Sequence, residues 1–171
     1  MKTSRLNDAE FANYFNTYTN LVEDVNVVKA LKKSKKHVFN LLKNLPKEKH
    51  EFRYAEGKWT VKEMLLHIID NERVFINRAL RFSRNDATAL PGYEHNEYVG
   101  NSNANSRKLK DILKEYKTQR NCSIQFFKGL DDDMLKKTGI AGGNKLSVRA
   151  IAYILAGHDI HHCSVFEERY L

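Results

Sequence analysis

Two histidines, His158 and His162, are the residues of this sequence best suited to chemistry, and they lie four positions apart near the end of the chain. At 100° per residue this spacing puts both imidazoles on one face of a helix, one turn apart. Apolar residues precede and follow them at helical spacing, so this face is predicted to point into a core, with His161 at its edge. Two imidazoles arranged in this way can chelate one divalent metal ion.

A metal site of the catalytic type uses three protein ligands and leaves one position open, here for water, a thiolate or a substrate. His67 is the candidate third ligand because it lies inside the apolar run from Leu65 to Ile69, where a polar ring needs a partner. We therefore predict that His67, His158 and His162 bind the metal. The spacing alone leaves open the alternative that these histidines are hydrogen-bonded packing residues of the core.

Two other histidines, His37 and His50, and both cysteines carry no predicted role. His37 and His50 lie in charged surface contexts. His95 lies in the loop from Pro91 to Val99, where exposure is expected, with an approach to a site as the alternative. Cys122 and Cys163 are far apart and form no CxxC pair, so they predict neither a disulfide framework nor a cysteine-based zinc site.

Four amphipathic segments of similar length are predicted to be the helices that position these histidines. They run from about residue 26 to 45, 60 to 84, 106 to 129, and 147 to nearly the end of the chain. Thr60 and Glu63 match a capping box, and Gly129 is a C-cap candidate. Ser106 and Ser147 precede the last two helices. An aromatic segment, residues 8–22, predicts a short helical lead-in.

Long polar connections over residues 85–105 and 131–145 separate the later helices, and no segment shows a strand pattern. The predicted fold is therefore all-α, a four-helix bundle formed by one domain over residues 1–171. The first of these connections is long enough to cross the full length of the bundle. Such a crossover would let the second and third helices run parallel, which periodicity alone does not establish.

The chain of 171 residues has a net charge of +8, spread along the sequence without a nucleic-acid-binding motif. We therefore expect no nucleic-acid partner. The first residues lack the apolar run of a signal peptide, and no apolar segment is long enough to cross a bilayer. Together with the unpaired cysteines, these features predict a cytoplasmic protein without a membrane partner.

From about Tyr14 to its end, the chain resembles the DinB-like superfamily in the order and spacing of its motifs. The matching segments are Gly57–Glu63, Leu66–Arg73, Arg78–Arg81, Leu90–Tyr93, Asn103–Arg107, Ser147–Ala150, Ala156–His162 and Glu168–Leu171. The resemblance implies an up-down-down-up bundle, often a homodimer, that holds a divalent metal on His67, His158 and His162. Zinc, nickel or iron suits a site of three imidazoles.

Members of this superfamily include thiol transferases that use bacillithiol, mycothiol or glutathione. The resemblance therefore implies transfer of a small thiol to an electrophile, in stress or detoxification, with that thiol as a second cofactor. Metal-dependent hydrolysis is one alternative, with Asp70, Asn71 and Glu72 as residues near His67 in sequence that are candidates for a general base. A non-enzymatic metal-binding stress or interaction protein is the other alternative.

Overall fold

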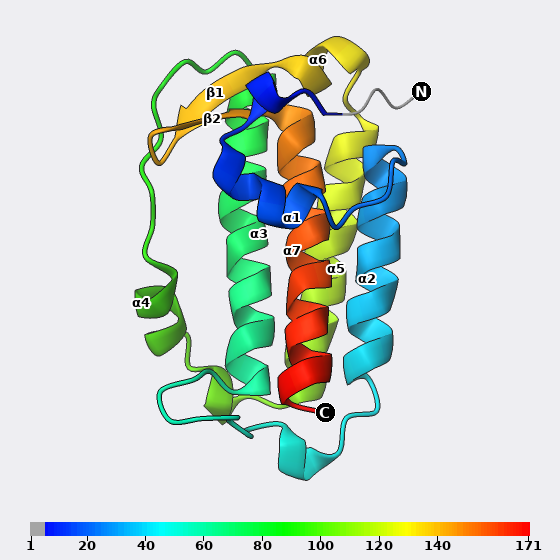
Figure 1. Ribbon diagram of the computed structural model, residues 1–171, viewed down its shortest axis with the longest axis vertical. Helices are drawn as coiled ribbons and strands as arrows, with labels where there is room; N and C mark the ends of the chain where they lie inside the picture. The colour runs from blue at the N-terminus through cyan, green and yellow to red at the C-terminus, as the bar shows by residue number, and fades with distance from the viewer. Residues whose placement is uncertain (1–5) are drawn as a thin grey trace.

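The computed structural model describes residues 6–171, in which four long helices form a bundle with smaller elements around it (Figure 1). The long helices are α2 (Val27–Leu42), α3 (Val61–Ser83), α5 (Leu109–Lys128) and α7 (Val148–Arg169). The short helices are α1 (Asn16–Thr19), α4 (His95–Gly100) and α6 (Asp132–Lys136). Residues 1–5, for which the sequence predicts no signal peptide, lie outside the described residues.

Helices α2 and α7 run in one direction through the bundle, and α3 and α5 run in the opposite direction (Figure 1). The connection between α3 and α5 therefore returns along the whole bundle, past α4, before α5 begins. Each of α2 and α3 packs against both α5 and α7. The predicted all-α bundle, its up-down-down-up order and its long crossover are confirmed.

No helix of the described part of the chain is long and apolar enough to cross a membrane.

Local capping interactions determine where two of the long helices begin. Thr60 Oγ1 accepts a hydrogen bond from the Glu63 backbone N–H at 3.1 Å, and Glu63 Oε2 accepts one from the Thr60 N–H at 2.7 Å. Ser147 Oγ caps α7 by accepting from the Ala150 N–H at 3.0 Å. The predicted start of α5 at Ser106 is wrong, because Ser106 belongs to a separate 3-10 turn that precedes the helix.

A small hairpin precedes α7, so the prediction that the chain contains no strand is wrong at this point. Strands β1 (Thr138–Ala141) and β2 (Asn144–Ser147) pair antiparallel. The turn between them consists of Gly142 and Gly143 at φ +57° and +75°, the left-handed backbone that a two-residue hairpin turn requires. Strands of four residues are too short for their alternation to stand out in the sequence.

The predicted aromatic lead-in forms two 3-10 turns and α1, which lies across α7 (Figure 1). The crossing is very close at Gly157, where a β-carbon would lie 2.0 Å from the Tyr18 carbonyl oxygen. Phe11 and Phe15, from the same segment, are buried in the hydrophobic core. The lead-in therefore covers the middle of α7, next to the histidines of that helix.

Candidate metal centre

Three imidazoles meet inside the bundle, His67 from α3 and both His158 and His162 from α7. The Nε2 atom of His158 lies 3.1 Å from that of His67 and 3.1 Å from that of His162. One nitrogen from each ring lies within 4.8 Å of the other two. The structure thus brings together all three residues that the sequence predicts as ligands, although His67 and His158 are 91 positions apart.

The spacing of the three nitrogens fits a divalent metal ion. Tetrahedral coordination with metal–nitrogen bonds of about 2.0–2.1 Å separates the ligand nitrogens by roughly 3.3 Å. The two separations of 3.1 Å are close to that value. If hydrogen bonds alone held the three rings together, the single Nε2 atom of His158 would have to pair with the Nε2 atoms of both His67 and His162. A metal cation instead accepts one nitrogen lone pair from each of the three rings.

Burial keeps the three rings neutral, which is the form of histidine that binds metal. Burial, followed by the effect of His95, lowers the pKa of His67 to about 4. Burial, followed by neighbouring imidazoles, also holds the pKa values of His158 and His162 well below the ordinary value. No positively charged ring therefore opposes a cation at neutral pH.

Asn71 of α3 supports His158 from the side opposite the other two rings. Its Nδ2 lies 3.5 Å from His158 Nδ1, and its Oδ1 accepts a hydrogen bond from the Tyr93 hydroxyl at 2.7 Å. A histidine that ligates through Nε2 carries its proton on Nδ1. With metal present, the Asn71 amide would therefore have to rotate by a half-turn from the orientation described above. Its oxygen would then accept from His158 Nδ1, and its NH2 group would donate to the Tyr93 hydroxyl. Of the described residues, none partners Nδ1 of His162.

A pocket of about 280 Å³ opens onto the three histidines, and its walls are largely aromatic. The aromatic residues are Tyr14, Phe15, Tyr18, Trp59, Phe75 and Tyr93. The ring of Trp59 is centred 4.8 Å from that of His67. His95 is exposed, as the sequence predicts, yet it also lines this pocket, with its ring centred 5.6 Å from that of His67.

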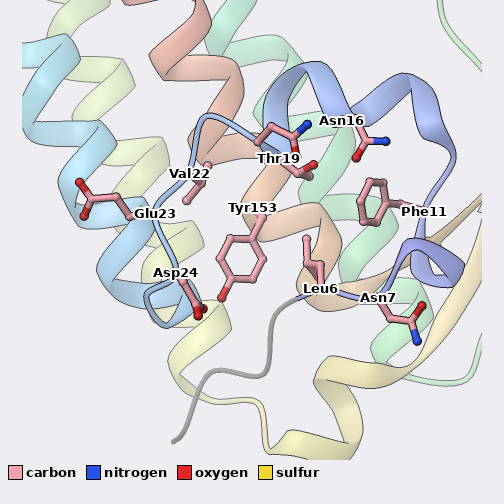
Figure 2. A pocket seen from close by; sticks show the side chains of 10 residues that line it. Leu6, Asn7, Phe11, Asn16, Thr19, Val22, Glu23, Asp24 and Tyr153 are labelled. Carbon is pink, nitrogen blue, oxygen red and sulfur yellow. The ribbon is translucent and has the colours of Figure 1, made fainter.

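A larger cavity, of about 930 Å³, lies between the lead-in segment and Tyr153 of α7 (Figure 2). Its acidic lining residues are Glu23 and Asp24, and the described part of its lining includes no histidine, cysteine, lysine or arginine. The residues suited to metal chemistry therefore gather in the smaller pocket.

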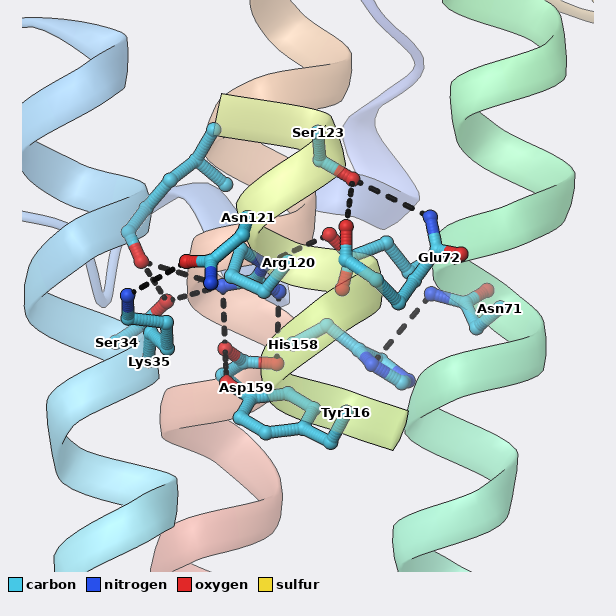
Figure 3. Close-up of polar contacts among 12 residues, drawn as sticks. Ser34, Lys35, Asn71, Glu72, Tyr116, Arg120, Asn121, Ser123, His158 and Asp159 are labelled. Atoms are coloured by element: carbon cyan, nitrogen blue, oxygen red, sulfur yellow. Dashed lines mark hydrogen bonds and ion pairs between the residues drawn. The ribbon is translucent and has the colours of Figure 1, made fainter. Parts of the chain in front are cut away.

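A buried ionic network centred on Arg120 of α5 lies beside His158 (Figure 3). Its Nε donates to Glu72 Oε1 at 2.7 Å, and its Nη1 and Nη2 donate to the two Asp159 carboxylate oxygens at 2.6 and 3.1 Å. Nη1 also donates to Ser34 Oγ of α2 at 2.6 Å, so the network joins all four long helices. Asp159 directly follows the candidate ligand His158. The network therefore restrains the rotation of α7 that points this imidazole into the pocket.

The three residues near His67 that the sequence suggests as general bases have different surroundings. Asp70 pairs with Arg73 at 3.0 Å, and Glu72 belongs to the buried network. Asn71 alone of the three lines the pocket, and an amide is not a general base. The structure therefore offers neither carboxylate to a substrate in this pocket.

Sequence reasoning missed the pocket residues Trp59, Arg78 and Tyr93 and the network residue Arg120. The sequence did offer a signal for Arg120, because it follows the predicted core residue Tyr116 by one helical turn; the structure shows that it is fully buried. Trp59 and Tyr93 lie outside the helices, where no periodicity marks the side that faces a site. Cys163 is buried, and burial raises the pKa of its thiol, which makes it a poor nucleophile.

The family model of the DinB superfamily matches residues 30–166 of the chain. Among solved structures, the chain is similar to YfiT from Bacillus subtilis, described as a probable metal-dependent hydrolase with an unusual four-helix bundle topology. The two chains are 14% identical, the match covers 83% of this chain and 82% of that chain, and the TM-score is 0.74. No curated protein matches the chain. At this identity the likeness to YfiT shows a shared fold.

Proposed function

The chain belongs to the DinB superfamily, and from this premise we propose that it is a metal-dependent enzyme that transfers a small thiol to an electrophile. The proposal is carried by one observation, the convergence of His67, His158 and His162 in a pocket lined by exposed residues such as Tyr14 and His95. A divalent zinc, nickel or iron ion held there would favour the deprotonated, nucleophilic form of a thiol.

The side chains around the three histidines have defined tasks in this proposal. Asn71 orients His158, and the aromatic walls exclude water and pack against the apolar part of the electrophile. The thiol sulfur forms a bond to the electrophilic carbon while the leaving group departs with its electron pair. His95 at the pocket wall accepts the thiol proton and passes it to solvent.

The lining of the pocket favours thiol transfer over hydrolysis. Among its described residues there is no aspartate or glutamate to serve as a general base, so the exposed His95 would have to serve in either reaction. A thiol, with an ordinary pKa of about 8.5, needs far less activation than water to become nucleophilic at neutral pH. Thiol transfer therefore demands less of the side chains present.

Hydrolysis is the second candidate because YfiT, which shares the fold, is described as a probable metal-dependent hydrolase. His95 would then be the general base, since it is the remaining imidazole of the pocket lining. A non-enzymatic metal-binding protein is the third candidate. The homodimer, the stress role and the cytoplasmic location stay predictions.

The metal site is tested by elemental analysis of the untagged protein purified from the cell and after incubation with zinc, nickel or iron. We expect about one ion per chain in the wild type and a loss of that ion in His158→Ala. His161→Ala is the matched control, because His161 lies on the same helix but packs against Tyr18 instead of joining the three ligands. Absence of metal from the wild type after reconstitution would overturn the proposal.

The reaction is tested with the metal-loaded wild type and with His158→Ala. We expect consumption of monochlorobimane that requires bacillithiol, mycothiol or glutathione and that is lost in the variant. Hydrolysis of p-nitrophenyl acetate without any thiol, lost in the same variant, would favour the second candidate. Stoichiometric metal binding without turnover in either assay would favour the third.

A further inference from the structure

Arg78 lines the histidine pocket from the far end of α3. It follows His67, Asn71 and Phe75 along that helix at spacings of three or four residues, so all four lie on one face. A long side chain on a helix points back toward the N-terminus, and the Arg78 guanidinium accordingly lies over the ring of Phe75. Its carbon lies 4.8 Å from the centre of the Phe75 ring.

The Arg78 side chain is largely covered by its neighbours, yet most of its hydrogen-bond donors have no partner among the described residues. The residue is 7% exposed, and its guanidinium also lies 5.9 Å from the centre of the Tyr93 ring. One nitrogen, Nη2, donates to the Pro91 carbonyl at 3.1 Å. Within the described residues no carboxylate pairs with it, and a guanidinium has five N–H donors. A guanidinium with free donors and no carboxylate partner among the described residues suits an anion that arrives with a ligand.

The β1–β2 hairpin holds the carbonyl that anchors Arg78. The Leu90 N–H donates to the Ile140 carbonyl at 2.9 Å, and the Gly142 N–H donates to the Leu90 carbonyl at 2.9 Å. Gly142 also packs against Gly92, whose Cα would lie 3.5 Å from a β-carbon at position 142. Pro91 is therefore held between two backbone contacts to the hairpin, and the guanidinium is oriented before any ligand binds.

The charges of the pocket are suited to an anionic ligand. Arg78 is positive, and the described lining residues include no aspartate or glutamate. A divalent ion on the histidines would add further positive charge. An anion bound at Arg78 would therefore meet this guanidinium directly and no competing carboxylate among the described lining residues.

Resting on the proposed function, we propose that the electrophile is a small carboxylic acid and that Arg78 binds its carboxylate. The planar guanidinium matches the two oxygens of a carboxylate. A single cation at this end of the pocket balances one negative charge, which favours a carboxylate over a phosphate dianion. The apolar part of the acid would pack between Phe75 and Tyr93 and reach toward the histidines.

The inference is tested by measuring the affinity of benzoate, of its neutral isostere benzamide and of inorganic phosphate by titration calorimetry, with and without bound metal. We expect the wild type to prefer benzoate over benzamide by about tenfold or more. Arg78→Met should abolish this preference and Arg78→Lys should retain part of it, because lysine keeps the charge but loses the planar donors. Arg81→Met is the matched control, because Arg81 pairs with Asp86 outside the pocket.

A preference for benzoate that is equal in the wild type and in Arg78→Met would overturn the inference, as would binding of phosphate but not of benzoate. The comparison with benzamide separates charge recognition from a damaged pocket, since damage weakens both ligands. The result is also separable from the proposed function. If the protein binds no metal but prefers benzoate through Arg78, the proposed function is refuted and the carboxylate site is supported. If it binds metal but shows no preference for benzoate, the carboxylate site is refuted and the metal site of the proposed function is supported.

Discussion

Gly157 allows α1 to cross α7, and replacing it with alanine tests whether this close approach exists. A β-carbon at this position would lie 2.0 Å from the Tyr18 carbonyl oxygen and 2.5 Å from its carbonyl carbon. Both neighbours are backbone atoms, so no side-chain rotation relieves the clash. The segment carrying Tyr18 and Phe15 must move away from α7, and with it one wall of the histidine pocket.

Two effects of Gly157→Ala oppose each other, and their magnitudes decide the sign. Alanine in a helix interior is favoured over glycine by about 0.8–1 kcal/mol. Displacement of α1 exposes Phe15, whose burial is worth about 1.5–3 kcal/mol, and breaks the ring contact of Tyr18 with His158, worth about 0.5–1.5 kcal/mol. We expect a net destabilisation of about 2 kcal/mol, which lowers the Tm by about 4–8 °C for a chain of this size.

Thermal unfolding of Gly157→Ala and of a control, Gly100→Ala, measures this difference. Gly100 also lies in a helix, but a β-carbon there would meet nothing within 4 Å, so its replacement should be neutral or stabilising. The fluorescence of Trp59, the single tryptophan of the chain, reports on the pocket wall in the same samples. If Gly157→Ala instead stabilises the protein by the full amount of about 0.8–1 kcal/mol that alanine gains over glycine in a helix, α1 does not cross α7 this closely.

Two further predictions concern charges outside the pocket. Arg120→Met should lower the free energy of unfolding in urea by about 3–5 kcal/mol, because it leaves the buried Glu72 and Asp159 without their cation; a loss under about 1 kcal/mol would contradict this. Burial alone would raise the pKa of Glu63. The hydrogen bonds that its carboxylate accepts from the Thr60 backbone N–H and from Arg53 outweigh burial and lower this pKa. The stability contributed by Glu63 is therefore complete above about pH 4.5 and is lost as the pH falls through its folded-state pKa. Thermal unfolding at a series of pH values should show this loss in the wild type and not in Glu63→Gln, and identical profiles would disprove the assignment.

The sequence by itself determined the features that depend on residues a few positions apart. The capping box of Thr60 and Glu63 and the Ser147 cap were predicted because each is a contact within one helical turn. The pairing of His158 with His162 was predicted for the same reason, since helix geometry alone brings residues four apart together. His67 was identified as a candidate by its apolar neighbours, and its distance from the other two rings could not be known.

The tertiary structure decided what depends on segments distant in the sequence. Arg120 meets Glu72 across 48 positions and Asp159 across 39, and only the packing of α3, α5 and α7 determines that these charges face one another. The contact of Gly157 with Tyr18 depends on how closely two helices cross, and the position of Arg78 in the pocket depends on a hairpin that holds Pro91. Helical periodicity shows which residues share a face of a helix. The crossing of the helices determines what that face meets.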